Sequence, residues 1–370
     1  MNDVSPAPDD ALPTTRLIKG RGAASNPEGR FESTRHHAED DGWQSALLDE
    51  EAPRPLTEVT EERARSVISR NDSPDIGFSQ AINPYRGCEH GCIYCYARPS
   101  HGYLNLSPGL DFETKLRAKV NLAEVLRGEL GKPGYVVSPI NIGSNTDPYQ
   151  PVEKRWRLTR AVLELLAECH HPCTIVTKNA LVERDLDILV PMARECLAQV
   201  FVSVNSLDNR LAAKLEPRAS APHRRIQAIR ALTEAGVPAG VMVAPIIPAL
   251  NDRDMEAVLE QAAAAGARSA GYTTVRLPYE LKALFREWLA LHAPQRAEHV
   301  ISLVQQMNGG RDYDSDFSTR MHGQGVFADL LRKRFHIACR KHGLNRAREL
   351  RLDTTRFVPP RAITPQGELF

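Results

Sequence analysis

Three cysteines lie close together at Cys88, Cys92 and Cys95, in the order Cys88-Glu-His-Gly-Cys92-Ile-Tyr-Cys95. The other four cysteines of the chain are scattered through apolar or helical surroundings, where an inert buried thiol is the usual case. In a reducing compartment such clustering favours ligation of a metal ion or an iron–sulfur cluster over disulfide formation. The spacing therefore predicts a metal centre held by these three thiolates.

Three thiolates are one fewer than the four that complete a structural zinc site or an all-cysteine iron–sulfur cluster. In a cubane cluster this leaves one iron open to a substrate or cofactor. A zinc ion is the alternative, with His90 as its fourth ligand. Because His90 lies between two of the cysteines, in a short loop that must also wrap the metal, the spacing favours the cluster.

The elements that position this loop follow from hydrophobic periodicity, since short β-branched runs alternate with amphipathic helical patterns from about Gly77 onward. Strands are predicted at Gly77–Tyr85, Tyr135–Ile142, Thr174–Lys178, Val200–Asn205, Gly240–Pro245 and Ala270–Arg276. Helices are predicted between them at Glu113–Leu130, Arg157–His170, Arg184–Cys196, Pro222–Ala235 and Met255–Ala265. Such βα units in series predict an α/β fold with a parallel sheet.

Polar residues follow the predicted strands, as Asn141–Pro148 follows the second, Thr177–Asn179 the third and Ser203–Ser206 the fourth. In a barrel all strand carboxyl ends open onto one face, so these residues and the cysteines would converge on one site. A complete eight-unit barrel needs more units than the pattern contains. We therefore expect a partial (βα)6 TIM-like barrel.

Charge is distributed unevenly along a chain whose net charge is only +1. Residues 1–75 carry 9 basic and 16 acidic side chains, a net charge of −7, and are rich in Pro, Gly, Ser and Asp. This composition predicts a mostly disordered leader, with one helix near Leu56–Ile68. Its role is left open between a solvated tail and an arm that binds a partner.

The carboxyl-terminal part is expected to be helical at Lys282–Leu291, Arg296–Met307 and Gly325–Lys341. Residues 320–370 carry 11 basic and 4 acidic side chains, a net charge of +7. This surface could contact the phosphates of nucleic acid, or it could be an ordinary solvated helix face. Its basic side chains are Arg332, Lys333, Arg334, Arg340, Lys341, Arg346, Arg348 and Arg351.

Three regions are thus expected, a leader over 1–75, a core domain over 76–280 and a basic helical extension over 281–370. No stretch approaches the roughly 18 uninterrupted apolar residues of a membrane helix. The amino terminus has acids and prolines where a signal peptide has a basic start and an apolar segment. We expect a cytoplasmic protein without a membrane partner.

The CxxxCxxC spacing, with the aromatic Tyr94 directly before the last cysteine, resembles the loop that defines radical S-adenosylmethionine (SAM) enzymes. Further segments over roughly residues 77–280 resemble the branch of that superfamily related to spore photoproduct lyase, a DNA repair photolyase-like group. They are Asn83–Cys88, Cys92–Arg98, Thr146–Pro151, Thr177–Lys178, Ser203–Ser206, Glu216–Pro217 with Arg225, and Val243–Ile246.

The resemblance implies a 4Fe–4S cluster on Cys88, Cys92 and Cys95, with SAM bound to its open iron. Cleavage of SAM would give a 5′-deoxyadenosyl radical, at the expense of one electron from a reductant such as flavodoxin or ferredoxin. It also implies that Lys178 pairs with the SAM carboxylate. The remaining SAM contacts that the resemblance implies are Tyr94, Thr146 and Ser203. The chain also has Glu216 and Arg225 of the family pattern, which we expect to form a structural ion pair.

Two further positions bear on the reaction. Tyr96, with Tyr94, resembles a tyrosine pair associated with radical relay in spore photoproduct lyase. Ser144 stands where that lyase has a hydrogen-donating cysteine, and a serine O–H bond is too strong to return a hydrogen atom to a carbon radical. The resemblance thus predicts a lyase-like radical SAM enzyme of unidentified substrate, with nucleic acid as the candidate. The alternative is a non-catalytic iron–sulfur or zinc protein that recruits partners.

Overall fold

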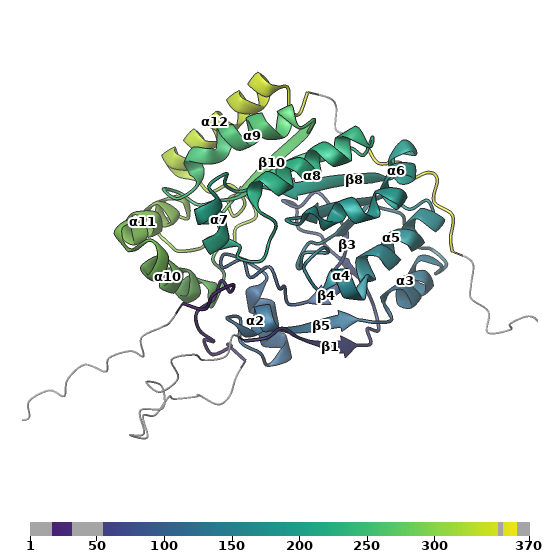
Figure 1. The fold of residues 1–370 in the computed structure, drawn as a ribbon, viewed down its shortest axis with the longest axis horizontal. Coiled ribbons are helices and arrows are strands. Elements are labelled where there is room, and N and C mark those ends of the chain that lie inside the picture. Colours follow the sequence, from purple (N-terminus) through teal and green to yellow (C-terminus); the bar gives the residue numbers. More distant parts are fainter. Residues whose placement is uncertain (1–16, 32–54, 347–350, 361–370) are drawn as a thin grey trace, which may run out of the picture.

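The computed structural model describes residues 17–31, 55–346 and 351–360 (Figure 1). Its main sheet has the strand order β10-β9-β8-β7-β6-β3-β2, in which every neighbouring pair is parallel except β2 with β3. The strands are β2 (Ile68–Arg70), β3 (Gln80–Ile82), β6 (Ile140–Ile142), β7 (Cys173–Thr177), β8 (Ala198–Ser203), β9 (Ala239–Ile246) and β10 (Ser269–Thr274). The six parallel strands confirm the six predicted units and the partial barrel.

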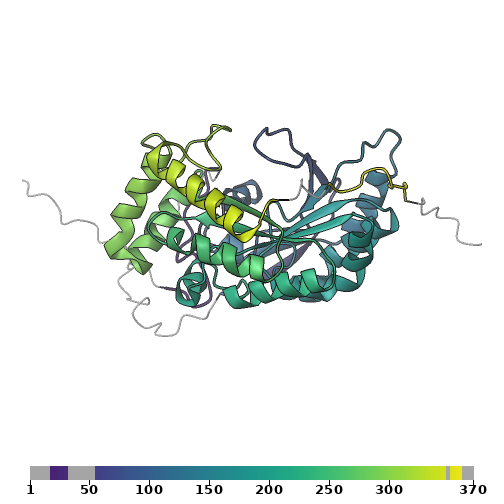
Figure 2. The ribbon, with the colours of Figure 1, turned by 90° about the horizontal axis from the view of Figure 1, so that it is seen from above.

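The crossover helices lie along one side of the curved sheet (Figures 1 and 2). They are α3 (Leu122–Leu130), α5 (Leu158–Glu168), α6 (Leu186–Arg194), α8 (Pro222–Glu234) and α9 (Met255–Ala264). Their apolar faces pack on the strands, and side chains such as Leu126, Leu163 and Val258 are fully buried in the main core. Because the helices cover this side, the site must form at the strand ends.

A second, smaller sheet corrects two sequence expectations. It has the order β1-β5-β4, with β1 (Glu58–Glu62), β4 (Tyr85–Arg86) and β5 (Lys115–Lys119). The helix expected near Leu56–Ile68 is wrong, since β1 occupies that stretch. The helix expected over Glu113–Leu130 is wrong in its first half, where only a short α2 (Asp111–Thr114) precedes β5. Alternate residues of β5 are buried, which is the period of a strand rather than of a helix.

Two segments of the acidic leader, residues 17–31 and 55–75, are described and pack on the core. Arg21 and Ala23 are buried, and the backbone N–H groups of Gly22 and Ala23 donate to the Glu113 carboxylate at 2.9 and 2.8 Å. The composition of the leader did not predict this docking. Its other residues, 1–16 and 32–54, lie outside the described part of the chain.

The expected helical extension is confirmed as α10 (Leu281–His292), α11 (Ala297–Met307) and α12 (Gly325–His342). Helix α12 packs beside α9, where the Arg334 guanidinium pairs with Glu256 at 2.7 and 2.8 Å (Figure 1). Residues 351–360 return across the opposite end of the sheet, and Val358 donates its N–H to the Cys169 carbonyl at 2.9 Å. None of the described helices is long and apolar enough to cross a membrane.

The remaining short elements connect these units. They are α4 (Glu153–Trp156), α7 (Asn209–Leu215) and the 3-10 helices η1 (Arg98–Leu104), η2 (Ala180–Asp185), η3 (Asp252–Asp254) and η4 (Pro294–Arg296).

Candidate active site

A cavity of about 250 Å³ opens at the carboxyl ends of the parallel strands. Its wall is built from the cysteine loop, the segment after β6, the ends of β7, β8 and β10, and the second half of β9. This convergence is what the polar residues after the predicted strands indicated. All nine residues singled out from the sequence line this cavity: Cys88, Cys92, Cys95, Tyr94, Tyr96, Ser144, Thr146, Lys178 and Ser203.

The cysteine loop lies between β4 and η1 and is held from behind by Arg98. This side chain is fully buried, and its guanidinium donates to the carbonyls of Gly91 and Cys92 at 3.2 and 2.9 Å and pairs with Glu113. Glu113 in turn accepts the leader's N–H groups, so one buried carboxylate joins the leader to the loop. The turn that carries the cysteines is thereby fixed on the side away from the cavity.

The three thiols fit a cluster held by thiolates. All seven cysteines are free, and Cys88, Cys92 and Cys95 share the cavity wall. Burial raises the pKa of the Cys92 and Cys95 thiols above the usual value, so a bound cation would be needed to hold them as thiolates. Within the described residues, no three His, Cys, Asp or Glu side chains are already arranged around a single metal ion, and this holds for the three thiols as well as for the zinc arrangement with His90.

His90 forms an ion pair that the sequence did not indicate. It is 1% exposed, and its Nδ1 lies 3.3 Å from the Asp147 carboxylate. Burial lowers the pKa of His90, but the charge and hydrogen bond of Asp147, together with the nearby Cys88 thiol, raise the pKa to about 10. Asp147 also accepts from the Lys178 N–H and the Thr177 hydroxyl, each at 2.7 Å. The pair therefore ties the cysteine loop to the ends of β6 and β7. A buried His–Asp contact across 57 positions has no local sequence signature.

A second tie between the same two regions is made by Gln150, which is fully buried. Its Oε1 accepts from the Glu89 N–H at 2.8 Å, and its Nε2 donates to the Gly87 carbonyl at 3.3 Å. These two peptide groups flank Cys88. The amide of Gln150 thus fixes the backbone on both sides of the first cysteine, a role that its position in the Thr146–Pro151 motif did not reveal.

Tyr94 is oriented by a buried chain of polar groups. Its hydroxyl donates to Glu216, which pairs with Arg225, and Arg225 donates to the Ser203 carbonyl at 3.0 Å. The expected Glu216–Arg225 ion pair is confirmed. Because the chain ends on Ser203, it sets two of the predicted SAM contacts relative to each other. The amide nitrogen of Asn205 also lies 3.4 Å from the Tyr94 hydroxyl.

Lys178 and Thr146 differ in how free their polar groups are. The Lys178 ammonium lies 5.9 Å from the centre of the Tyr94 ring and has no carboxylate partner among the described residues. Its charge is therefore available to an anionic group in the cavity. The Thr146 hydroxyl donates to the Tyr85 carbonyl at 3.2 Å, so it can offer only its lone pairs to a ligand.

Tyr96 and Ser144 are in contact, since the Tyr96 hydroxyl donates to the Ser144 carbonyl. The Ser144 hydroxyl accepts from the Asn83 amide at 3.1 Å. The preceding Gly143 has a φ of +97°, and an added Cβ would lie 2.5 Å from the Pro148 ring, so this turn requires glycine. Ser144 is thereby presented to the cavity from a fixed turn.

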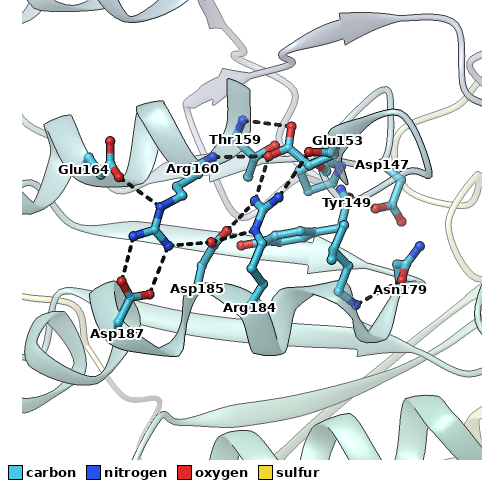
Figure 3. Close-up of polar contacts among 12 residues, drawn as sticks. Asp147, Tyr149, Glu153, Thr159, Arg160, Glu164, Asn179, Arg184, Asp185 and Asp187 are labelled. Atoms are coloured by element: carbon cyan, nitrogen blue, oxygen red, sulfur yellow. Dashed lines mark hydrogen bonds and ion pairs between the residues drawn. The ribbon is translucent and has the colours of Figure 1, made fainter. Parts of the chain in front are cut away.

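Behind the cavity, a buried network holds the segment after β6 on α5 and η2 (Figure 3). Glu153 accepts from the Tyr85 hydroxyl, from the Thr159 N–H at 3.1 Å and from Arg184 at 2.8 Å. Arg184 also pairs with Asp185 at 2.8 Å. The carboxylates are all satisfied from within the network, so its role is to support the motif rather than to bind a ligand.

The extension contributes to the site, which the expected boundary at 280 did not suggest. Met321 lines the cavity, and its carbonyl accepts from the Thr274 N–H at 2.9 Å. Arg276, directly after β10, also lines the cavity and places its guanidinium 4.2 Å from the centre of the Tyr96 ring. Neither residue belongs to the motifs that the sequence brought forward.

The partial βα barrel gathers in one cavity three thiols, an arginine and a lysine that has no ion pair within the described residues, which is the arrangement expected of a protein that holds a cofactor through cysteine ligands. The model of the Radical SAM superfamily matches residues 82–262, and the chain belongs to this superfamily. Members bind a 4Fe–4S cluster and SAM, and the chain is accordingly a radical SAM enzyme.

An uncharacterized protein of Mycobacterium tuberculosis is 38% identical over 231 residues, which cover 62% of this chain and 68% of that protein. A radical SAM Nα-GlyT isomerase of Pseudomonas phage M6 is 28% identical over 194 residues, covering 51% of this chain and 38% of the isomerase. Spore photoproduct lyase complexed with dinucleoside spore photoproduct shares the fold, with a TM-score of 0.52 at 17% identity over 77% of this chain and 80% of the lyase.

Proposed function

We propose that this chain binds a 4Fe–4S cluster through Cys88, Cys92 and Cys95 and cleaves SAM reductively to act on a nucleic-acid substrate in a lyase-like reaction. The observation that carries the proposal is that the three thiols and Lys178, which has no ion pair in the described part of the chain, line one cavity at the strand ends. When bound, the cluster supplies the electron that converts SAM to methionine and a 5′-deoxyadenosyl radical, which removes a hydrogen atom from the substrate.

The chain's own residues would hold SAM in a fixed orientation. Lys178 neutralises the methionine carboxylate, since its ammonium faces the cavity without another partner among the described residues. Tyr94 packs against the adenine, and its hydroxyl is held by Glu216. Ser203 and the lone pairs of Thr146 supply polar contacts from two different strand ends. Together these groups would fix the ribose carbon beside the substrate.

In spore photoproduct lyase, a cysteine at this position donates a hydrogen atom to the substrate radical. This chain has Ser144 there, so a lyase-like reaction must end in another way. Tyr94 and Tyr96 both line the cavity, and Tyr96 is the radical-relay candidate beside Ser144, whose carbonyl accepts from its hydroxyl. We therefore assign Tyr96 and Ser144 to the part of the cavity where the substrate would react, with Ser144 in a positioning role.

Nucleic acid as the substrate class has two supports. The first is the shared fold with spore photoproduct lyase, whose structure is complexed with dinucleoside spore photoproduct. The second is the exposed side of α12, which carries Lys333, Arg340 and Lys341. Arg332 and Arg334 are already paired with Asp329 and Glu256. The three remaining charges predict binding of oligonucleotides that weakens with added salt. We place the enzyme in the cytoplasm, with flavodoxin or ferredoxin as the reductant, because its cysteines are all free.

The test is anaerobic reconstitution with iron and sulfide, followed by addition of SAM and dithionite. We expect about four irons per chain and formation of 5′-deoxyadenosine. Cys92→Ala should abolish both, whereas Cys339→Ala, which removes a buried thiol on α12, should retain both. Zinc uptake at one ion per chain with no iron would overturn the proposal and favour a non-catalytic metal protein.

A further inference from the structure

We propose that Arg276 holds an anionic group of the substrate, a phosphate or a carboxylate, in a side cavity next to the SAM site. The side cavity is about 380 Å³ and shares six residues with the site cavity. They are Tyr96, Gly143, Ser144, Val176, Arg276 and Met321. This inference rests on the proposed function, and it adds that the substrate of that reaction carries an anionic group.

The charges around the side cavity leave one cation uncompensated. Arg320 lines it and is bound at two points by Asp75, at 2.5 and 2.7 Å. Arg276 lines it as well and has no ion pair among the described residues. Asp75 forms its ion pair with Arg320 and also acts on Arg276 at longer range, while Arg276 interacts with the Tyr96 hydroxyl. Among the described residues, two arginines thus share one carboxylate at this cavity, which leaves one net positive charge, and the arginine without an ion pair is Arg276. An unpaired, partly buried guanidinium is costly unless an anion completes it.

A second observation comes from Asn141, which is 4% exposed and lines the same cavity. Its amide donates to the Thr174 hydroxyl at 3.0 Å, across the β6–β7 pair where these two residues are in register. Its Oδ1 has no hydrogen-bond partner among the described residues. A buried acceptor without a partner is unfavourable, so a ligand that donates an N–H or O–H here would be favoured.

The position of Arg276 separates its role from that of Lys178. Lys178 follows β7 and lies near Tyr94, on the side of the cysteine loop. Arg276 follows β10 and stacks on Tyr96, at the border between the two cavities. One cation therefore faces SAM and the other faces the side cavity. A ligand anchored on Arg276 would place its next atoms beside Tyr96 and Ser144, where the radical would act.

The guanidinium geometry limits the ligand further. Arginine presents parallel N–H donors that match the oxygens of a carboxylate or a phosphate, so a bound oxyanion would be held in one orientation. The side cavity also has the aromatic rings of Phe78, Tyr96 and Tyr313 in its wall. The ligand that fits is an oxyanion attached to a flat, partly apolar group with a hydrogen-bond donor for Asn141.

The experiment measures binding of three small probes to the reconstituted, SAM-loaded enzyme by anaerobic calorimetry. Phenyl phosphate and benzoate carry the two kinds of oxyanion on the same ring, and benzamide is the neutral match. We expect at least one anion to bind more tightly than benzamide, and Arg276→Gln to weaken that anion about tenfold or more while benzamide binding stays the same. Arg63→Gln, at a side chain 76% exposed, is the matched control.

Preference for phenyl phosphate would identify a phosphate-bearing substrate such as a nucleotide, and preference for benzoate a carboxylate-bearing one. The inference is overturned if benzamide binds as tightly as both anions, if Arg276→Gln changes neither anion, or if it weakens only SAM. The 5′-deoxyadenosine formed by the wild-type enzyme with dithionite is measured in parallel. Its absence would refute the proposed function, whereas its presence together with unselective probe binding would refute only the role of Arg276.

Discussion

Replacement of Gln150 by leucine should destabilise the protein and loosen its first cysteine. The change removes both hydrogen bonds of a fully buried amide and leaves the Glu89 N–H and the Gly87 carbonyl without partners. Each buried, unsatisfied group costs about 1–3 kcal/mol. The apolar leucine regains part of that loss by burial. We therefore expect the free energy of unfolding to fall by about 2–4 kcal/mol.

The assay is urea unfolding of the metal-free chain, combined with the rate at which a chelator removes iron from the reconstituted enzyme. Gln261→Leu is the control, since Gln261 lies on the exposed side of α9 and should leave both quantities unchanged. Gln150→Glu keeps the acceptor for the Glu89 N–H but turns an oxygen toward the Gly87 carbonyl, so it should speed iron loss as well. Equal unfolding energies and equal iron-loss rates for Gln150→Leu and wild type would refute the reasoning.

Three further outcomes are expected. Burial lowers the pKa of His171 to about 4, so the unfolded chain binds a proton that the folded chain does not, and the free energy of unfolding should fall as the pH drops from about 6.5 toward 4. Urea unfolding at about pH 7 and pH 5 should show a smaller loss of stability in His171→Gln than in the wild type. An equal loss in both proteins would contradict this role of His171. In Gly22→Ala the added Cβ would lie 1.8 Å from the Gly91 carbonyl oxygen, so the leader segment must shift. Trypsin should then cleave faster after Arg21, which is buried in the wild type. Unchanged cleavage would count against the docking of the leader on the core. Lys178→Ala should weaken SAM binding to the reconstituted enzyme about tenfold by calorimetry, and unaltered binding would remove its assigned role.

The strand order and the convergence of the site were predictable because both depend on local patterns. Strands β7, β8, β9 and β10 begin and end within a few residues of their predicted bounds. Each is a short β-branched run followed by polar residues, and right-handed crossovers leave few ways to assemble them. Once the parallel order is given, the carboxyl ends must share a face, so the cysteines and Lys178 had to meet.

The errors share a different cause, which is pairing between distant segments. Residues Lys115–Lys119 form a strand because β1 lies beside them, with Val59 opposite Leu116, and not because of their own propensity. The leader segment around Arg21 is held by residues far along the chain, among them Glu113, whose carboxylate accepts from the Gly22 and Ala23 N–H groups and whose carbonyl accepts from Arg21. Composition averages over such contacts, so it predicted too little structure in the leader. The same limit hid Arg276 and Met321, whose place in the site depends on how the extension folds back.

The positions of the seven cysteines limit which groups could donate a hydrogen atom to a substrate radical in this cavity. Three of the seven cysteines line it, and these are the proposed cluster ligands. The other four lie elsewhere: Cys169 caps the end of α5, Cys196 follows α6, Cys173 begins β7 and Cys339 lies on α12. With Ser144 unable to donate a hydrogen atom, no free thiol in the cavity can quench a substrate radical. In the proposed lyase-like reaction the hydrogen atom would return from 5′-deoxyadenosine, either directly or through the Tyr96 hydroxyl, whose radical would then take the hydrogen atom of 5′-deoxyadenosine.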